Sequence, residues 1–194
     1  MRFIFKGVSE YLEDLVTCID VPQLDNLDIT FFNQIDFDTP RLAQFINRTP
    51  TFRARNEGHV RFHDRTVDFE LTYRTHKFGF TTCRIGISCR ELDWQLSSIA
   101  QVCNSSLLLL SMVEDLYIGH RYWQLLRKND AIEDTLLWLE LLLPFTAAKN
   151  LYLAEEVVST IAATLQQLVG NRITEVLPSL QNIFIREPFQ EHIE

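Results

Sequence analysis

The sequence predicts an α/β fold of the solenoid type, with a parallel sheet on its concave side, helices on its convex side and a β-hairpin-like insertion near residues 58–80. A six-residue pattern recurs along the chain, its copies are about 30 residues apart, and segments with the apolar spacing of helices separate them. The order strand–helix–strand implies parallel strands joined by right-handed crossovers. Each such unit can bury its apolar face only against its neighbours.

Each full copy of the pattern, here called a hexad, has apolar residues at its first, fourth and sixth positions and Asn or Asp at its third. The full copies span residues 24–29, 113–118, 148–153 and 180–185, weaker copies span 52–57 and 82–87, and residues 3–5 fit the end of a seventh. The starts at 24, 52, 82, 113, 148 and 180 give steps of 28, 30, 31, 35 and 32 residues. Leucine-rich repeats run roughly 20–29 residues, so the match is to that class of repeat.

The first two helices are expected after the first strand and after the first full hexad. Residues 3–6 read as a short strand, and Ser9 stands where a side chain can cap the helix that follows. Thr39 and Pro40 give a second start signal, a capping residue followed by proline at the first helical position. The apolar residues at helical spacing are Leu12, Leu15, Val16 and Ile19 in the first helix and Leu42, Phe45 and Ile46 in the second.

Between the second and third hexads the apolar period changes from that of a helix to that of a strand. Apolar and polar residues alternate in runs between Val60 and Phe80. We therefore expect a hairpin with its turn near His63 to Arg65. Arg55 stands where the hexad requires a core leucine, and we expect an irregular strand there because a buried unpaired guanidinium costs several kcal/mol.

The second half of the chain repeats the strand–helix order. A helix follows the third hexad. The next begins with Asp130 and Glu133 in a capping-box arrangement and stops at Pro144; it is apolar nearly all round, which indicates burial on more than one side. The last spans residues 155–169 and ends before Gly170. The inward residues are expected to be Leu92, Leu96, Ile99 and Cys103 in the first of these helices and Val158, Ile161, Leu165 and Leu168 in the last.

Length and composition limit the domain number, the environment and the partners. The 194 residues, 46% of them apolar, suffice for one core, and we expect a single irregular repeat domain over residues 1–188 and a C-terminal tail at 189–194. The net charge of −8 argues against nucleic-acid binding. No apolar stretch approaches the roughly 20 residues of a membrane span. Without a recognisable signal peptide, the expectation is an intracellular protein, cytoplasmic or nuclear.

No sequence motif predicts catalysis, a metal site or a cofactor. His59 and His63 are four residues apart, and in a strand this spacing separates them by ~13 Å, too far to share a metal ion. The chain has no GxSxG, no HExxH and no glycine-rich phosphate loop. We therefore expect a protein that is not an enzyme and that has no cofactor and no metal. A small hydrolase on an α/β sheet is an alternative without a motif behind it.

The residues that alternate with the hexad leucines are candidates for binding, because successive strand residues point to opposite faces of a sheet. The residues expected to contact a protein partner on the concave face are Tyr117, Tyr152, Phe184, Asp28, Asp115, Arg84 and Arg186. Parallel strands lie ~4.8 Å apart, so Tyr117, Tyr152 and Phe184 should form an aromatic ladder. Such side chains are enriched in protein-binding hot spots. A ladder that only stabilises the sheet, or that packs under a loop or the tail, is the alternative.

A neighbouring column carries the Asn or Asp of each hexad. Asn26, Asn150 and Asn182 are interpreted as structural, with side chains that hydrogen-bond neighbouring strands or turns. The hexad alignment also places Arg84 level with Asn26 in this column, and Gly86 level with Asp28 in the next.

The hexads and the segments that join them resemble a known family. With the connecting segments ITFFNQIDFDTPRLAQFINRTP, CRELDWQLSSIAQVCNSS and LLLPFTAAKNLYL, they look like the leucine-rich-repeat region of F-box-like proteins of mushroom-forming fungi, over residues 3 to about 188. The resemblance implies repeats that choose the substrate of a ubiquitin ligase, coupled through an F-box to a Skp-type adaptor. This chain begins inside a repeat. We therefore expect either part of a longer receptor or a stand-alone scaffold protein that self-associates through open solenoid ends.

Overall fold

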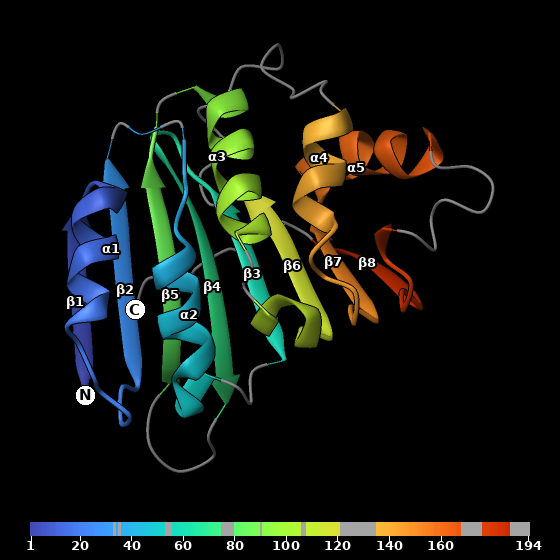
Figure 1. The fold of residues 1–194 in the computed structure, drawn as a ribbon. Helices are drawn as coiled ribbons and strands as arrows, with labels where there is room; N and C mark the ends of the chain where they lie inside the picture. Colours follow the sequence, from blue (N-terminus) through green and yellow to red (C-terminus); the bar gives the residue numbers. More distant parts are fainter. Residues whose placement is uncertain are drawn as a thin grey trace, which may run out of the picture.

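The computed structural model describes residues 1–32, 34, 36–52, 56–74, 80–89, 91–105, 108–120, 135–167 and 176–186. Within these ranges the chain forms an eight-stranded sheet with helices packed against it (Figure 1). The predicted α/β class is confirmed. The expected tail at 189–194 lies outside the described residues, as do Arg55, Asp130, Glu133 and Leu168.

One strand of the described sheet runs against the other seven. The strands are β1 (Arg2–Gly7), β2 (Asn26–Phe32), β3 (Glu57–Phe62), β4 (Thr66–Arg74), β5 (Phe80–Ser88), β6 (Asp115–His120), β7 (Asn150–Ala154) and β8 (Asn182–Arg186). Their order across the sheet is β1-β2-β5-β4-β3-β6-β7-β8. β4 is antiparallel to its neighbours β5 and β3, and the other neighbouring pairs are parallel.

The helices cover one face of the sheet, which Figure 1 shows behind them. The described α-helices are α1 (Ser9–Thr17), α2 (Pro40–Arg48), α3 (Leu92–Asn104), α4 (Thr135–Leu142) and α5 (Glu155–Gln167), and the short 3-10 helices are η1 (Pro50–Phe52) and η2 (Leu108–Met112). The helices therefore leave the opposite face of the sheet uncovered within the described ranges.

The core lies between the sheet and the helices. The buried strand residues are Leu27, Ile29, Phe31, Val60, Phe62, Val67, Phe69, Leu71, Cys83, Ile85, Ile87, Leu116, Ile118, Leu151 and Leu153, and the buried helix residues include Leu12, Val16, Leu42, Phe45, Ile46, Leu96, Ile99, Cys103, Trp138 and Ile161. Leu15, expected to face inward, is exposed because α1 lies at the end of the helical layer with α2 as its helix neighbour. α4 packs against both α3 and α5, although its Leu136 is exposed.

The predicted hairpin is formed by β3 and β4, and it is part of the main sheet. Its turn spans residues 63–65 and is closed by a hydrogen bond of 2.8 Å from the N–H of His63 to the carbonyl of Thr66. The strand predicted for the hexad at 52–57 is wrong, because Phe52 ends η1 and β3 begins at Glu57. Gly58, and no leucine, pairs with Leu116. A Cβ on Gly58 would lie 3.1 Å from Cγ1 of Val113, so the valine fills the space of the missing side chain.

The expected row of hexad leucines is continuous only in the second half of the sheet. Leu116 pairs with Leu151, and Leu151 pairs with Ile183, as predicted. Ile85 was expected beside Leu27 but lies opposite Ile29, and the hairpin separates β5 from β6. The register of β5 is thus two residues away from the hexad alignment. A shift by two leaves every side chain on its predicted face, so the same residues are buried.

The starts of α1 and α2 are stabilised by side chains from other segments. The carboxylate of Glu13 in α1 accepts hydrogen bonds of 2.9 and 2.8 Å from two consecutive N–H groups in the first turn of α2. The side-chain oxygen of Gln34 accepts a hydrogen bond of 2.7 Å from the N–H of Ser9. Neither helix has a side-chain cap at its own N-cap residue, so the capping roles predicted for Ser9 and Thr39 are wrong.

Two residues at the same hexad position provide a test of this packing. Leu151 is 0% exposed and Ile183 is 51% exposed. Leu151→Ala should lower the free energy of unfolding by about 2–5 kcal/mol, because it opens a cavity in the core. Ile183→Ala should cost roughly 1 kcal/mol, because half of its surface already contacts water. Urea unfolding of both variants measures the difference, and equal losses would contradict the burial of β7 relative to β8.

Candidate functional site

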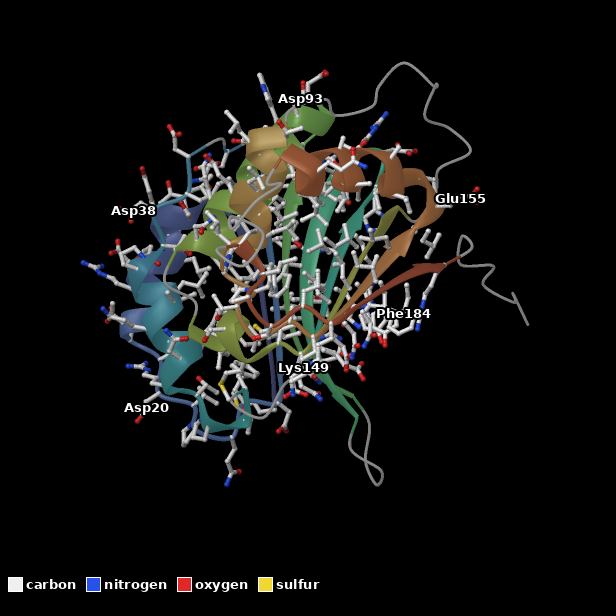
Figure 2. The ribbon with its side chains drawn as sticks, turned by 90° about the vertical axis from the view of Figure 1, so that its right-hand side faces the viewer. Asp20, Asp38, Asp93, Lys149, Glu155 and Phe184 are labelled. Atoms are coloured by element: carbon white, nitrogen blue, oxygen red, sulfur yellow. The ribbon has the colours of Figure 1, made fainter. Side chains whose placement is uncertain are left out.

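The sheet face turned away from the helices, here called the open face, carries the side chains that alternate with the core residues. Figure 2 shows Phe184 on this side of the sheet, whereas Asp20 and Asp38 lie on the side of α1 and α2. The strand register aligns the middle residues of the open face in a row that reads, from β1 to β8, Ile4, Asp28, Arg84, Glu70, His59, Tyr117, Tyr152 and Phe184. The seven predicted binding residues and the three structural asparagines all belong to this face.

Four rings form an aromatic stack on the half of the open face built by β3, β6, β7 and β8. The centroid distances are 4.5 Å between His59 and Tyr117, 4.3 Å between Tyr117 and Tyr152, and 4.7 Å between Tyr152 and Phe184. The ring planes are within 14° of parallel. The structure places the three predicted ladder residues together and adds His59, which the sequence alignment missed because the hexad of β3 was displaced.

The geometry of the stack decides which of its atoms face solvent. Tyr117 and Tyr152 have an aromatic neighbour on each side, so their edges and hydroxyl groups, and not their faces, are free for contact. The guanidinium carbon of Arg186 is 4.9 Å from the Tyr117 centroid and 4.5 Å from that of Tyr152. Because these distances are similar, the cation lies alongside the pair of rings.

The predicted structural role of the asparagine column is supported by side-chain hydrogen bonds. Asn150 donates to the carboxylate of Asp115 at 2.7 Å, and Asn182 donates to the side-chain oxygen of Asn150 at 2.9 Å. At the other end of the sheet, the Asn26 side-chain oxygen accepts a hydrogen bond of 3.0 Å from the N–H of Thr82. Each of these bonds joins neighbouring strands, so the column helps to fix their register.

An ion-pair network, made of Arg2, Asp28, Arg84, Asp68, Glu70 and Arg61, covers the other half of the open face. Asp28 lies between two guanidinium groups, 3.2 Å from that of Arg2 and 3.4 Å from that of Arg84. Arg84 also lies 3.5 Å from Asp68, and Arg61 pairs with both Asp68 and Glu70. Arg84 and Asp28 were predicted to lie on this face, whereas Arg61, Asp68 and Glu70 of the hairpin were not. Charged residues at alternate positions of β3 and β4 were the available signal.

Asp68 is the buried member of this network. Its side chain is 3% exposed, and one carboxylate oxygen accepts a hydrogen bond of 2.7 Å from Nε2 of His63. Burial alone raises the pKa of the Asp68 carboxyl, but the hydrogen bond from His63 and the charges of Arg84 and Arg61 outweigh burial, so the pKa lies below the usual 3.8. Burial lowers the pKa of Arg84, but the charge and hydrogen bond of Asp68, together with the charges of Asp28 and Glu70, raise it above its usual value. The two groups are therefore charged at neutral pH.

A polar hollow of about 320 Å³ opens where β1, β2 and β5 meet. It is lined by Arg2, Asn26, Asp28, Thr82 and Arg84. The predicted columns need a correction here. Arg84 lies level with Asp28, and Gly86 lies level with Thr30, because the register of β5 is shifted by two residues. In the observed register Arg84 contacts the carboxylate of Asp28, whereas the hexad alignment placed these two residues in different columns.

The described residues contain no group of three or more His, Cys, Asp or Glu side chains that could hold a metal ion. His59 lies in the aromatic stack and His63 binds Asp68, so the two histidines have different surroundings. Burial raises the pKa of the Cys103 thiol far above its usual value, which suits a packing role.

No protein-family model, curated protein or solved structure matches the chain. None of the described helices combines the length and the apolar character that crossing a membrane requires. The open face is therefore interpreted from its own geometry.

The stacked histidine predicts a pH dependence of stability. Burial, and to a smaller extent the positive charges of Arg61 and Arg186, lower the pKa of His59 from 6.5 to about 4. The unfolded chain thus binds a proton more readily, and stability should fall as the pH drops from about 6.5 to about 4, by up to about 3 kcal/mol. His59→Phe keeps a ring in the stack but cannot titrate. The difference in unfolding free energy between wild type and variant should change over this pH range, and a constant difference would contradict the assignment.

The buried carboxylate should contribute more to stability than an exposed one. Asp68→Asn removes the charge that faces Arg61, Arg84 and His63, and it should lower the free energy of unfolding by about 3 kcal/mol at pH 7. The control is Asp25→Asn, because Asp25 pairs with the N-terminal amine at 2.8 Å and is 54% exposed. That surface pair should be worth no more than about 1 kcal/mol. Thermal or urea unfolding checks both values, and losses of equal size would contradict the buried network.

Proposed function

We propose that this chain is a leucine-rich-repeat-like protein-interaction module, and that the open face, as the concave side of the repeat array, binds a protein partner. The observation that carries the proposal is that the described helices leave a whole sheet face uncovered, on which an aromatic stack adjoins an ion-pair network. The described part of the chain holds no group of three or more His, Cys, Asp or Glu side chains that could bind a metal ion.

Backbone geometry supports the repeat assignment. In four places the carbonyl group before a strand accepts hydrogen bonds of 2.8–3.1 Å from two consecutive N–H groups at the start of the next parallel strand. The accepting residues are Met1, Asn56, Glu114 and Lys149. The same contact thus joins β1 to β2, β3 to β6, β6 to β7 and β7 to β8, and it includes β3, whose hexad was expected at residues 52–57. Such recurrence is typical of stacked repeats that contact only their neighbours.

The size of the open face suits a protein partner. Eight strands at ~4.8 Å spacing span roughly 34 Å, and five residues extend ~17 Å along a strand, which gives about 600 Å². A standard interface buries about 800 Å² on each partner. The open face therefore supplies most of the area that a stable complex needs.

The chemistry of the open face also suits a folded or extended polypeptide. The aromatic stack offers ring edges, two tyrosine hydroxyls and the Arg186 guanidinium, a combination enriched in binding hot spots. Burial, and to a smaller extent the neighbouring Tyr152, raise the pKa of Tyr117. Its hydroxyl therefore remains protonated and can donate a hydrogen bond. The ion-pair network beside it can contribute specificity through charge complementarity.

The role in ubiquitin ligation follows from the resemblance to F-box-like proteins. In that arrangement the open face would select the substrate, and an F-box outside these repeats would hold the Skp-type adaptor. The two functions are separable, because partner binding by the open face does not require the adaptor.

A position-specific cross-linking experiment tests the proposal. A photoreactive phenylalanine analogue at position 184 lies on the open face, and the same analogue at position 11 lies exposed on α1. In cell extract, the first should cross-link to a set of proteins that the second does not reach. Mass spectrometry identifies these proteins, and similar sets from both positions would contradict binding at the open face.

A matched pair of variants connects the cross-links to the stack. Tyr117→Phe with Tyr152→Phe keeps the four rings and removes two hydroxyls, whereas Tyr11→Phe removes one exposed hydroxyl on the helical side. The double variant should lose about thirtyfold in affinity for a captured partner if each hydroxyl makes a hydrogen bond worth about 1 kcal/mol. The Tyr11→Phe variant should bind like wild type.

A further inference from the structure

The outer edge of β8 exposes residues whose counterparts on β7 are buried. Ile183 and Ile185 are 51% and 65% exposed, whereas the paired residues Leu151 and Leu153 are 0% and 2% exposed. β8 is the last strand in the described sheet order. The hexad pattern that places these aliphatic residues in a core elsewhere therefore leaves them half in solvent here.

The backbone of β8 has hydrogen-bonding groups that point away from β7. The N–H of Asn182 donates to the carbonyl of Lys149 at 3.0 Å, so Asn182 is bonded toward the interior of the sheet. In a parallel strand, alternate residues direct their N–H and C=O groups to opposite neighbours. Ile183 and Ile185 must therefore direct theirs outward, as an exposed edge does.

The asparagine column has a direction, and this direction selects the residue that could come next. Asn150 donates to Asp115, and Asn182 donates to the oxygen of Asn150. The side-chain oxygen of Asn182 is then the acceptor for the following strand. A carboxylate has no proton to offer it, so the next residue in the column must be a donor such as asparagine.

The aromatic stack is also open toward this edge. Phe184 uses one face of its ring against Tyr152. Its other face is turned in the direction in which a further strand would lie, about 4.8 Å away. An aromatic side chain at that position would extend the stack, as each ring does for the preceding one.

We propose that the outer edge of β8, which no described strand pairs with, binds an extended peptide segment of a partner protein in parallel, as a further strand with the sequence pattern Asn–aliphatic–aromatic–aliphatic. Main-chain hydrogen bonds would supply affinity and the three side-chain columns would supply selectivity, as in other cases of strand addition. A second copy of the chain fits this edge poorly, because β1 would place Ile4 where the aromatic stack requires a ring.

The binding test uses the full chain and a labelled peptide copying residues 147–156, which contain the hexad strand β7. Fluorescence anisotropy measures affinity, and NMR hydrogen exchange measures the N–H groups of Ile183 and Ile185. The peptide should bind and slow exchange at both groups. Replacing its asparagine by aspartate should weaken binding about tenfold, because the donor is lost. A control peptide has Leu–Asn–Leu–Tyr in place of Asn–Leu–Tyr–Leu. This order puts every side chain on the wrong face of the strand, so the peptide should not bind.

Two variants of the protein separate edge binding from folding. Ile185→Pro removes an outward N–H and is compatible with an edge strand. Ile185→Val keeps the N–H. The proline variant should unfold like the valine variant but bind the peptide at least about tenfold more weakly.

Several outcomes would overturn the proposal. One is that all three peptides bind with equal affinity, or that none binds. Another is that Ile185→Pro binds the peptide with the affinity of wild type. A third is that the N–H groups of Ile183 and Ile185 exchange slowly before peptide is added. Concentration-dependent sedimentation that Ile185→Pro abolishes would also overturn it, because a second copy would then occupy the edge.

Discussion

The parallel register of β6, β7 and β8 is the constraint on which the rest of the structure depends. It aligns Leu116 with Leu151, and in the same step it brings Tyr117 within stacking distance of Tyr152. A slip by one residue would exchange the two faces and expose the leucines. The core and the open face are thus set by a single pairing. The side-chain bonds of Asn150 and the stacked rings hold that pairing from the open side.

The hairpin of β3 and β4 holds its half of the sheet together by a different interaction. β4 is antiparallel to both of its neighbours. The antiparallel strand places acidic Asp68 and Glu70 between the basic residues Arg84 and Arg61. Burying a carboxylate is unfavourable unless it is paired, and Asp68 has His63 and two guanidinium groups around it. On this half of the face, charge alternation across the strands replaces ring stacking as the interaction that ties them together.

The sequence was sufficient to predict the elements whose hexads are intact. Residues 113–118 and 148–153 form neighbouring strands, and the ring positions within them could be predicted because burial and exposure alternate with period two. The position of β3 could not be predicted because Gly58 stands where the hexad requires a leucine. Val113 fills the space of the missing side chain, and this contact joins residues far apart in the chain. The register of β5 could not be predicted because a shift by two residues keeps the same side chains in the core. Glu13 and Gln34 cap helices over distances that no local motif encodes.

The same periodicity that stabilises the interior gives the last strand its distinct character. A residue such as Leu151 has a strand on each side, and its burial is complete. Ile183 occupies the same hexad position with a described strand on one side, and half of its surface is exposed. β8 repeats the Asn–aliphatic–aromatic–aliphatic pattern of β7, so its greater exposure comes from its position at the edge of the described sheet. The same aliphatic positions therefore form core where a described strand lies on each side, and a half-exposed surface where a described strand lies on one side.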